Sequence, residues 1–267
     1  MADPRSYARS RQRLLLAALV GLVTALPVGC RAVRDAWLGD LGIIGDPHPA
    51  VLYSVDISVD VEHLMLALTI DDGPDAETTP IILDVLERND ARATFFVLSD
   101  RIEGNEALVR RMIEEGHELG NHMARDFPSV ELPPQEFEAE LLEAEGVLSL
   151  FDETRWFRPG SGWYNEEMLS TLSEQGYDLA LGSIYPLDAH IPSTAFARNL
   201  LLWRAQPGAI IVLHDVGKRG LRTADTLSRV LPELTRRGYR VVTLSELVDG
   251  RAMALGAENR NSPKPQR

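Results

Sequence analysis

Short strand-like runs alternate with helix-like segments from residue 63 to residue 247, and this alternation constrains the fold more than any other feature. The strand-like runs combine β-branched, aromatic and small apolar residues and are followed by turn-forming residues. They cover residues 64–69, 93–97, 118–121, 155–158, 179–181, 209–214 and 240–243. Strands that alternate with helices in this way form a parallel sheet, either open or closed into a barrel. The sequence therefore predicts an α/β fold.

The segments between the strands have the apolar spacing of amphipathic helices. The clearest case is an acidic segment that begins at Pro134, a residue favoured in the first turn of a helix. Its apolar stripe consists of Phe137, Leu141, Ala144 and Leu148. Gly176 follows the next helix-like segment and predicts a glycine C-cap there.

Composition excludes several classes of protein and of site. The net charge of −13 argues against a nucleic-acid-binding surface, which needs clustered Lys and Arg. Cys30 is the single cysteine, so the chain forms no internal disulfide and no metal site built from several thiolates. Any metal must therefore be held by His, Asp and Glu side chains.

The N-terminal region has the form of an export signal. Four arginines in residues 1–13 precede an uncharged apolar segment at 14–28, which is shorter than the usual membrane-spanning helix. Cys30 follows Gly29, as at a bacterial lipoprotein cleavage site. Three interpretations remain open: a lipoprotein with Cys30 lipidated, a cleaved signal, and an uncleaved membrane anchor. All three place the folded part outside the cytoplasm.

The same features predict the organisation of the chain. The expected parts are a signal or anchor at 1–30, a linker with an edge strand at 31–62, a catalytic domain at 63–250 and a disordered tail at 251–267.

Polar residues follow five of the predicted strands. The carboxyl ends of parallel strands meet at one edge of a sheet or barrel, where catalytic groups of α/β enzymes lie. For Asp71 and Asp72, which follow the first strand, a structural role is the alternative, because Asp also favours turns and helix caps. The strand-end residues are Asp71 and Asp72, His122, Arg158, Asp188 and His214.

These residue types suggest metal-assisted hydrolysis of an acyl bond. His122 and Asp126 are four residues apart and would meet in a helical turn. With Asp72 they would provide three ligands for a divalent cation, leaving positions for water and substrate. Asp71 could then accept a proton from water.

The other strand-end residues complete this scheme. Arg158 could keep the Asp71 carboxylate ionised and oriented. His214 could protonate the leaving group, with Asp188 keeping the imidazole charged.

Four motifs, in this order, resemble those of the polysaccharide deacetylases of carbohydrate esterase family 4, the NodB-homology domain. They are Thr69-Ile70-Asp71-Asp72-Gly73-Pro74, Gly120-Asn121-His122, Phe157-Arg158-Pro159 and Leu213-His214-Asp215. The resemblance implies a distorted (β/α)7 barrel that removes acetyl groups from N-acetylated sugars in a polysaccharide, chitooligosaccharide or peptidoglycan. It also implies a divalent metal, with zinc expected and manganese or cobalt as alternatives.

The resemblance assigns a role to each matching residue. Asp71 would be the base, Arg158 its partner and His214 the acid, while Asp72 and His122 would be metal ligands. The backbone N–H of Ser161 would help to bind the oxyanion. Trp163 and Tyr164 follow this motif and would either line the sugar site or pack in the core.

The sequence departs from the family pattern at three places. Asp126 replaces the second metal histidine, and an oxygen-rich Asp-His-Asp set shifts the preference from zinc toward manganese. Gly160 and Ser161 replace a Pro-Tyr pair, and Tyr185 and Ala189 replace an Asp and a Trp. Two alternatives follow: a degenerate barrel that binds glycan without hydrolysing it, and an amidase acting on a small non-sugar amide.

Overall fold

The computed structural model describes residues 48–57, 64–188 and 190–250. The described residues from Pro49 to Gly250 belong to one compact unit. The apolar segment 14–28, Cys30 and the C-terminal tail lie outside the described residues, so the predicted signal and tail stay predictions. None of the helices within the described ranges is long and apolar enough to cross a membrane.

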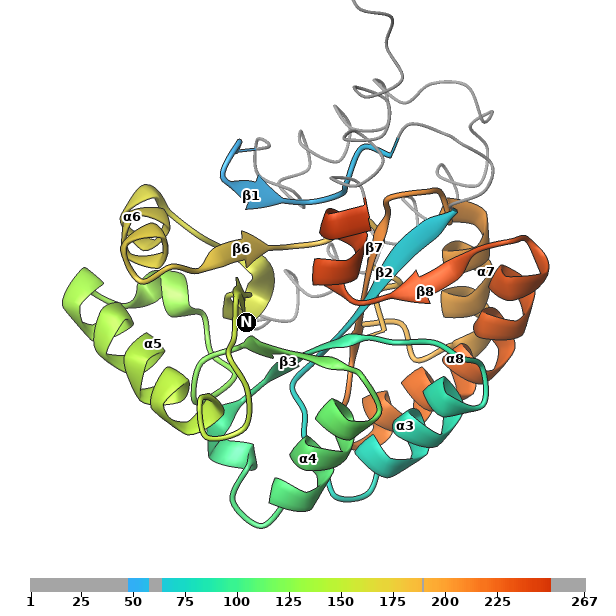
Figure 1. Ribbon diagram of the computed structural model, residues 1–267, viewed down its shortest axis with the longest axis horizontal. Helices are drawn as coiled ribbons and strands as arrows, with labels where there is room; N and C mark the ends of the chain where they lie inside the picture. The colour runs from blue at the N-terminus through green and yellow to red at the C-terminus, as the bar shows by residue number, and fades with distance from the viewer. Residues whose placement is uncertain (1–47, 58–63, 189, 251–267) are drawn as a thin grey trace, which may run out of the picture. The chain divides into compact units, whose positions relative to one another are not determined.

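A parallel sheet forms the centre of this unit (Figure 1). Its strand order is β1-β6-β5-β4-β3-β2-β7, and β8 pairs with β2 beside β3. The strands are β1 (Val51–Leu52), β2 (Met65–Asp71), β3 (Thr94–Val97), β4 (Glu118–Asn121), β5 (Trp156–Phe157), β6 (Asp178–Ala180), β7 (Ile210–His214) and β8 (Arg240–Val242). All seven predicted strands are present, and β1 adds an eighth at the edge.

The sheet curls into a barrel-like shape. Just after β6, Ile184 forms a parallel bridge with Ile211 of β7, which brings the two sides of the sheet together. The α/β prediction and the distorted (β/α)7 architecture are confirmed.

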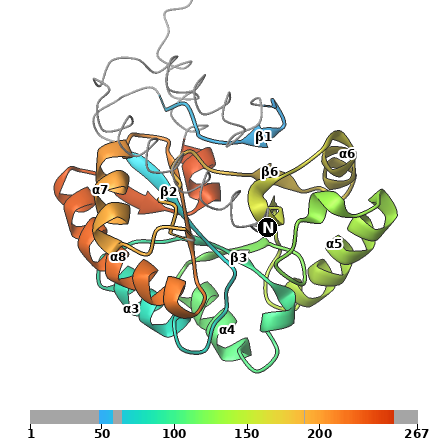
Figure 2. The same ribbon diagram turned by 180° about the vertical axis from the view of Figure 1, so that it is seen from behind.

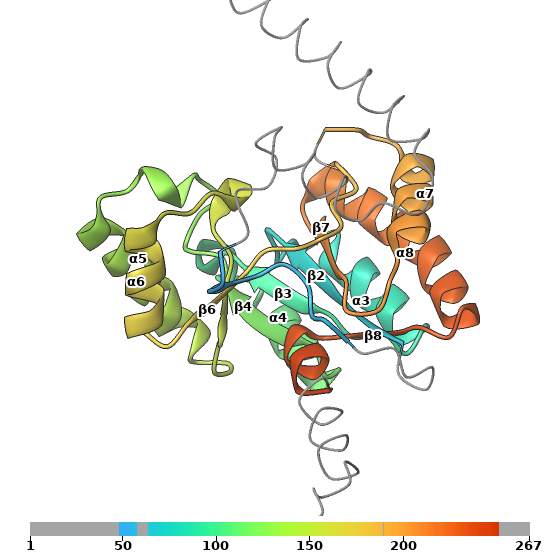
Figure 3. The ribbon, with the colours of Figure 1, turned by 90° about the horizontal axis from the view of Figure 1, so that it is seen from above.

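Helices surround the sheet in chain order (Figures 1 and 2). They are α3 (Thr79–Glu87), α4 (Glu106–Glu114), α5 (Pro134–Leu148), α6 (Glu166–Glu174), α7 (Thr194–Arg204) and α8 (Gly217–Arg236), with short 3-10 turns η1 (Ser99–Arg101), η2 (Ser129–Glu131) and η3 (Gly160–Gly162). Seen from above, the strands lie between α5 and α6 on one side and α7 and α8 on the other (Figure 3).

The structure confirms the residues predicted for the start and apolar stripe of α5 and for the C-terminal cap of α6. The predicted apolar stripe of α5 is buried, and the helix begins at Pro134. Gly176 has φ +79° directly after the end of α6, a conformation that a residue with a side chain rarely adopts. Only α8 begins much earlier than expected, at Gly217 instead of near Ala224.

The two-residue period of the strands decides which side chains reach the interior of the barrel. In β2, Leu66, Leu68 and Ile70 belong to the core cluster that also contains residues of α3 and α8. Each fully buried side chain of this kind contributes about 1.5–3 kcal/mol to stability. Ala67 belongs to the cluster on the other face, so Thr69 and Asp71 point into the interior by alternation.

Candidate active site

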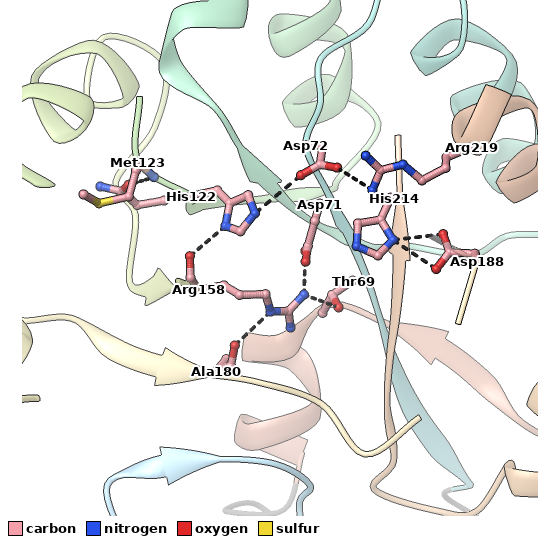
Figure 4. Close-up of polar contacts among 11 residues, drawn as sticks. Thr69, Asp71, Asp72, His122, Met123, Arg158, Ala180, Asp188, His214 and Arg219 are labelled. Atoms are coloured by element: carbon pink, nitrogen blue, oxygen red, sulfur yellow. Dashed lines mark hydrogen bonds and ion pairs between the residues drawn. The ribbon is translucent and has the colours of Figure 1, made fainter. Parts of the chain in front are cut away.

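Asp71 and His214 occupy equivalent positions at the ends of two adjacent strands. They are register partners in the parallel β2–β7 pair. In β7, Ile211 and Leu213 belong to the same core cluster as Leu66, Leu68 and Ile70 of β2, on the side that faces the helices. Because side chains alternate along a strand, His214 points to the opposite, inner face, as Asp71 does. Figure 4 shows the two side chains next to each other, each with a different partner.

Arg158 holds Asp71 through a short, buried ion pair. Its Nη1 lies 2.6 Å from Asp71 Oδ1, and the two side chains are 3% and 6% exposed. The same nitrogen donates to Thr69 Oγ1 at 2.7 Å. Nε and Nη2 donate to the carbonyl oxygens of Ala180 and Leu181, each at 2.9 Å.

Phe96 completes the support of this arginine, because the guanidinium carbon lies 4.0 Å from its ring centroid. A charge this well buried is stable only when its donors are satisfied, as they are here. Arg158 therefore fixes the orientation of the Asp71 carboxylate.

Asp188 holds His214 in a second charged pair. His214 Nδ1 lies 2.9 Å and 3.0 Å from the two carboxylate oxygens of Asp188. A carboxylate only accepts, so Nδ1 carries a proton and Nε2 is the nitrogen left for substrate. Burial lowers the pKa of His214, but the hydrogen bond and the negative charge of Asp188 outweigh burial and raise it. His214 is thus favoured in its charged form.

Asp72 follows β2 in the left-handed conformation, with φ 73°, which Asp tolerates better than most residues. Its Oδ1 lies 3.6 Å from His122 Nε2, and its Oδ2 lies 3.3 Å from Arg219 Nη1. Burial raises the pKa of Asp72, but His122, His214 and Arg219 together lower it below its ordinary value. Asp72 Oδ2 is buried and has no hydrogen-bond partner.

His122 is oriented by the backbone on its other side. Its Nδ1 lies 2.7 Å from the carbonyl oxygen of Arg158, which can only accept, so Nδ1 carries the proton. Nε2 then faces Asp72, in the arrangement common to metal-binding histidines. Burial lowers the pKa of His122, whereas the hydrogen bond to Asp72 and the charges of both aspartates raise it.

Asp126 does not join this pair, and the predicted Asp72–His122–Asp126 set is not formed. The expected helical turn after His122 is absent, and Asp126 lies exposed in a bend. The reason is the turn that follows β4: Asn121 Oδ1 accepts from the backbone N–H of Met123, which has φ 70°. Within the described ranges no three His, Cys, Asp or Glu side chains are grouped so as to hold a metal ion.

A divalent cation nevertheless fits the two remaining donors. The Asp72 carboxylate, whose Oδ1 lies 3.6 Å from His122 Nε2, and this imidazole nitrogen are donors of the types that zinc, manganese and cobalt accept. They lie beside Asp71 and His214, where a cation would act on the reacting groups (Figure 4).

The predicted substrate-contact residues lie in and just after η3. Ser161 has φ 63°, in the left-handed region that residues with a side chain rarely adopt. Trp163 is 53% exposed and is therefore not a core residue. Tyr164 is partly buried against an apolar cluster, and its hydroxyl lies 2.9 Å from that of Tyr53 near β1.

Three residues of the site were missed from the sequence. Thr69 and Phe96 both contact Arg158, and Thr69 could have been found because it shares a strand face with Asp71. Arg219 was missed because the Gly-rich start of α8 resembled a loop.

The curled parallel sheet, with acids and bases gathered at its carboxyl edge, defines a barrel hydrolase site, and comparison with known proteins gives the family. The family model described as polysaccharide deacetylase matches residues 58–180. A peptidoglycan-N-acetylglucosamine deacetylase of Bacillus cereus is 36% identical over 187 residues, which cover 69% of this chain and 88% of that protein.

Solved structures agree with this match. Peptidoglycan deacetylase PdaC of Bacillus subtilis has a TM-score of 0.69 and 29% identity, over 76% of this chain and 98% of that one. A family 4 acetyl xylan esterase of Clostridium thermocellum, solved with a cobalt ion, has a TM-score of 0.63 and 29% identity, over 68% of this chain and 89% of that one.

The chain belongs to the polysaccharide deacetylase family, carbohydrate esterase family 4, and is a hydrolase of carbon–nitrogen bonds other than peptide bonds. The family and reaction class expected from the four motifs are confirmed.

Proposed function

We propose that this hydrolase removes acetyl groups from N-acetylglucosamine residues of a bacterial cell-wall glycan. The observation that carries the proposal is the pair of register partners Asp71 and His214, each held by its own buried partner of opposite charge, Arg158 for the carboxylate and Asp188 for the imidazole. An ionised carboxylate beside a charged imidazole is the combination that amide hydrolysis needs. The peptidoglycan deacetylases among the relatives support the choice of glycan.

Asp71 acts as the general base in this proposal. Arg158 keeps one carboxylate oxygen occupied by a hydrogen bond, so the carboxylate is fixed in one orientation. It takes a proton from the water that attacks the acetyl carbonyl carbon. A positioned base of this kind contributes roughly 10²–10⁴ to the rate.

His214 acts as the general acid. The leaving group of an amide is an amine, which must be protonated as the carbon–nitrogen bond breaks. His214 donates this proton, and Asp188 stabilises the imidazolium until the transfer takes place.

Asp72 and His122 would hold the divalent ion, for which zinc, manganese and cobalt are the candidates. When bound there, the ion supplies Lewis-acid polarisation of the acetyl carbonyl and of the attacking water. The burial of both ligands keeps this part of the site away from bulk solvent.

The loop that contains η3 would receive the substrate. The backbone N–H of Ser161 would donate to the acetyl oxygen as negative charge develops on it. The exposed Trp163 offers a surface on which a sugar ring can stack. The N-terminal signal or lipid anchor predicted from the sequence would place this site on the outer side of the membrane, where cell-wall glycan lies.

The test is acetate release by the purified full-length chain, supplied in turn with zinc, manganese and cobalt. The substrates are N-acetylglucosamine oligomers, purified peptidoglycan and a short non-sugar N-acetyl amide. Acetate release from the two glycans that falls by about 10² or more in Asp71→Asn supports the proposal. Release from the small amide alone would indicate the amidase alternative, and glycan binding without any release would indicate a binding barrel.

A further inference from the structure

We propose that Arg219 provides the counter-charge of Asp72 when no metal is bound and thereby weakens the binding of a divalent ion. This inference rests on the proposed function, because it concerns the same metal ligands. Arg219 lies in the first turn of α8, and its guanidinium faces the carboxylate of Asp72 (Figure 4).

The Arg219 side chain provides a counter-charge for Asp72 but no hydrogen bond to Asp72 Oδ2. Arg219 Nη1 lies 3.3 Å from Asp72 Oδ2, close enough for an ion pair. The same oxygen nevertheless has no hydrogen-bond partner although it is buried. An arginine that fitted this carboxylate as a permanent structural partner would form the short, parallel hydrogen bonds typical of such pairs.

Exposure separates Arg219 from the structural arginine of the site. The Arg158 side chain is 3% exposed and donates to four acceptors, so it cannot leave. The Arg219 side chain is 31% exposed. Its guanidinium can therefore swing into solvent without crossing the core.

The imidazole that would share a divalent ion with Asp72 faces the other carboxylate oxygen, Oδ1, at 3.6 Å. An ion bound there and the guanidinium at Oδ2 would be two positive charges on one carboxylate, and they would repel each other. The ion therefore binds more weakly while the Arg219 guanidinium stays beside Asp72. The absence of a third acidic or histidine ligand among the described residues fits this arrangement, since a positive side chain stands beside Asp72 instead. Arg219 thus stabilises the Asp72 carboxylate when no ion is bound and lowers the affinity of the site for the ion.

The neighbouring basic residues do not share this geometry, and one of them provides a control. Lys218 is exposed and precedes Arg219 directly. Its removal changes the net charge by the same amount at nearly the same place. Arg222 donates to the backbone oxygen of Asp188, the partner of His214, and is therefore not used as a control.

The experiment measures binding of zinc and of manganese to the chelator-treated full-length chain by titration calorimetry. Arg219→Ala and Arg219→Gln are expected to bind each ion roughly ten times more tightly than the unmodified chain, since a nearby positive charge is removed. Lys218→Ala is expected to stay within about twofold, because an exposed charge is screened. Asp72→Asn should abolish binding in every background.

Thermal unfolding gives a second readout that does not depend on activity. Without metal, Arg219→Ala should unfold at a lower temperature than the unmodified chain, because the buried Asp72 loses its counter-charge. With saturating metal the difference should disappear. Unchanged or weaker ion binding in Arg219→Ala, or an equal gain in Lys218→Ala, would overturn the inference.

These results are distinguishable from a failure of the proposed function. If the ions bind as predicted but no acetate is released, the role of Arg219 stands and the deacetylase proposal fails. If no variant binds either ion, the inference about Arg219 is wrong.

Discussion

Asp71 and His214 are register partners on the parallel strands β2 and β7, so the spacing between the proposed base and acid is set by the sheet itself. Neighbouring strands lie about 4.8 Å apart, and the backbone N–H of Asp215 donates to the carbonyl oxygen of Asp71 at 2.8 Å. The backbone thus holds the two groups together. Their partners, Arg158 and Asp188, carry opposite charges, and this difference is the basis for proposing opposite roles for the two groups.

The first prediction concerns the base. Asp71→Asn should lower kcat/KM for N-acetylglucosamine oligomers by about 10²–10⁴, because the amide cannot accept the proton from water. Affinity for zinc or manganese, measured by calorimetry, should stay close to that of the unmodified chain. Loss of ion binding in this variant would show that Asp71 is a ligand and not the base.

The second prediction concerns the partner of the base. Arg158→Met leaves the buried Asp71 carboxylate without its counter-charge and should lower the free energy of unfolding by about 3–5 kcal/mol, measured in urea. Arg155→Met is the matched control, because Arg155 pairs with Asp178 at the surface. That variant should lose no more than about 1 kcal/mol. Equal losses in the two variants would contradict the structural importance of the Arg158 pair.

The third prediction concerns pH. Asp188 raises the pKa of His214, so Asp188→Asn should lower this pKa, and the protonated acid should be lost at a lower pH. The alkaline limb of the kcat/KM profile should therefore move toward lower pH, and activity at pH 7 should fall. The NMR titration of His214 should move in the same direction. His190→Gln, at an exposed loop residue, should change neither curve.

Much of this architecture could be predicted from the sequence because it depends on local patterns. Runs of β-branched and apolar residues located the strands, and the three-to-four-residue period located the α5 stripe. The strand ends located Asp71 and His214. Asp126 could not be placed in this way. A spacing of four brings two residues together only in a helix, and the Asn121 side chain closes a different turn here.

Contacts between segments far apart in the sequence could not be predicted from the sequence pattern either. Phe96 supports Arg158 from another strand, and Arg219 reaches Asp72 from a helix that begins earlier than its apolar pattern indicates. Neither contact leaves a periodic signal, because each depends on how strands and helices pack together in three dimensions.

The fourth prediction tests the packing beneath Arg158. A Cβ atom at Gly120 would lie 2.7 Å from two carbons of the Phe96 ring, which is fully buried and carries the guanidinium. Gly120→Ala should therefore lower the free energy of unfolding by about 1–3 kcal/mol and reduce kcat. Gly146→Ala in α5 meets no atom within 4 Å and should stabilise the protein by about 0.5–1 kcal/mol. A neutral Gly120→Ala would mean that Phe96 is free to shift.

The fifth prediction tests whether Asp126 is a third metal ligand beside Asp72 and His122. Asp72 is buried with an unpartnered oxygen, whereas Asp126 is exposed in a bend. Asp72→Ala should therefore abolish binding of zinc and manganese. Asp126→Ala should change the affinity by less than about threefold, because an exposed carboxylate away from the ion acts only through screened charge. A loss of binding in Asp126→Ala comparable to that in Asp72→Ala would show that the bend after His122 refolds around the ion, and that the three-ligand set expected from the sequence forms only when metal is present.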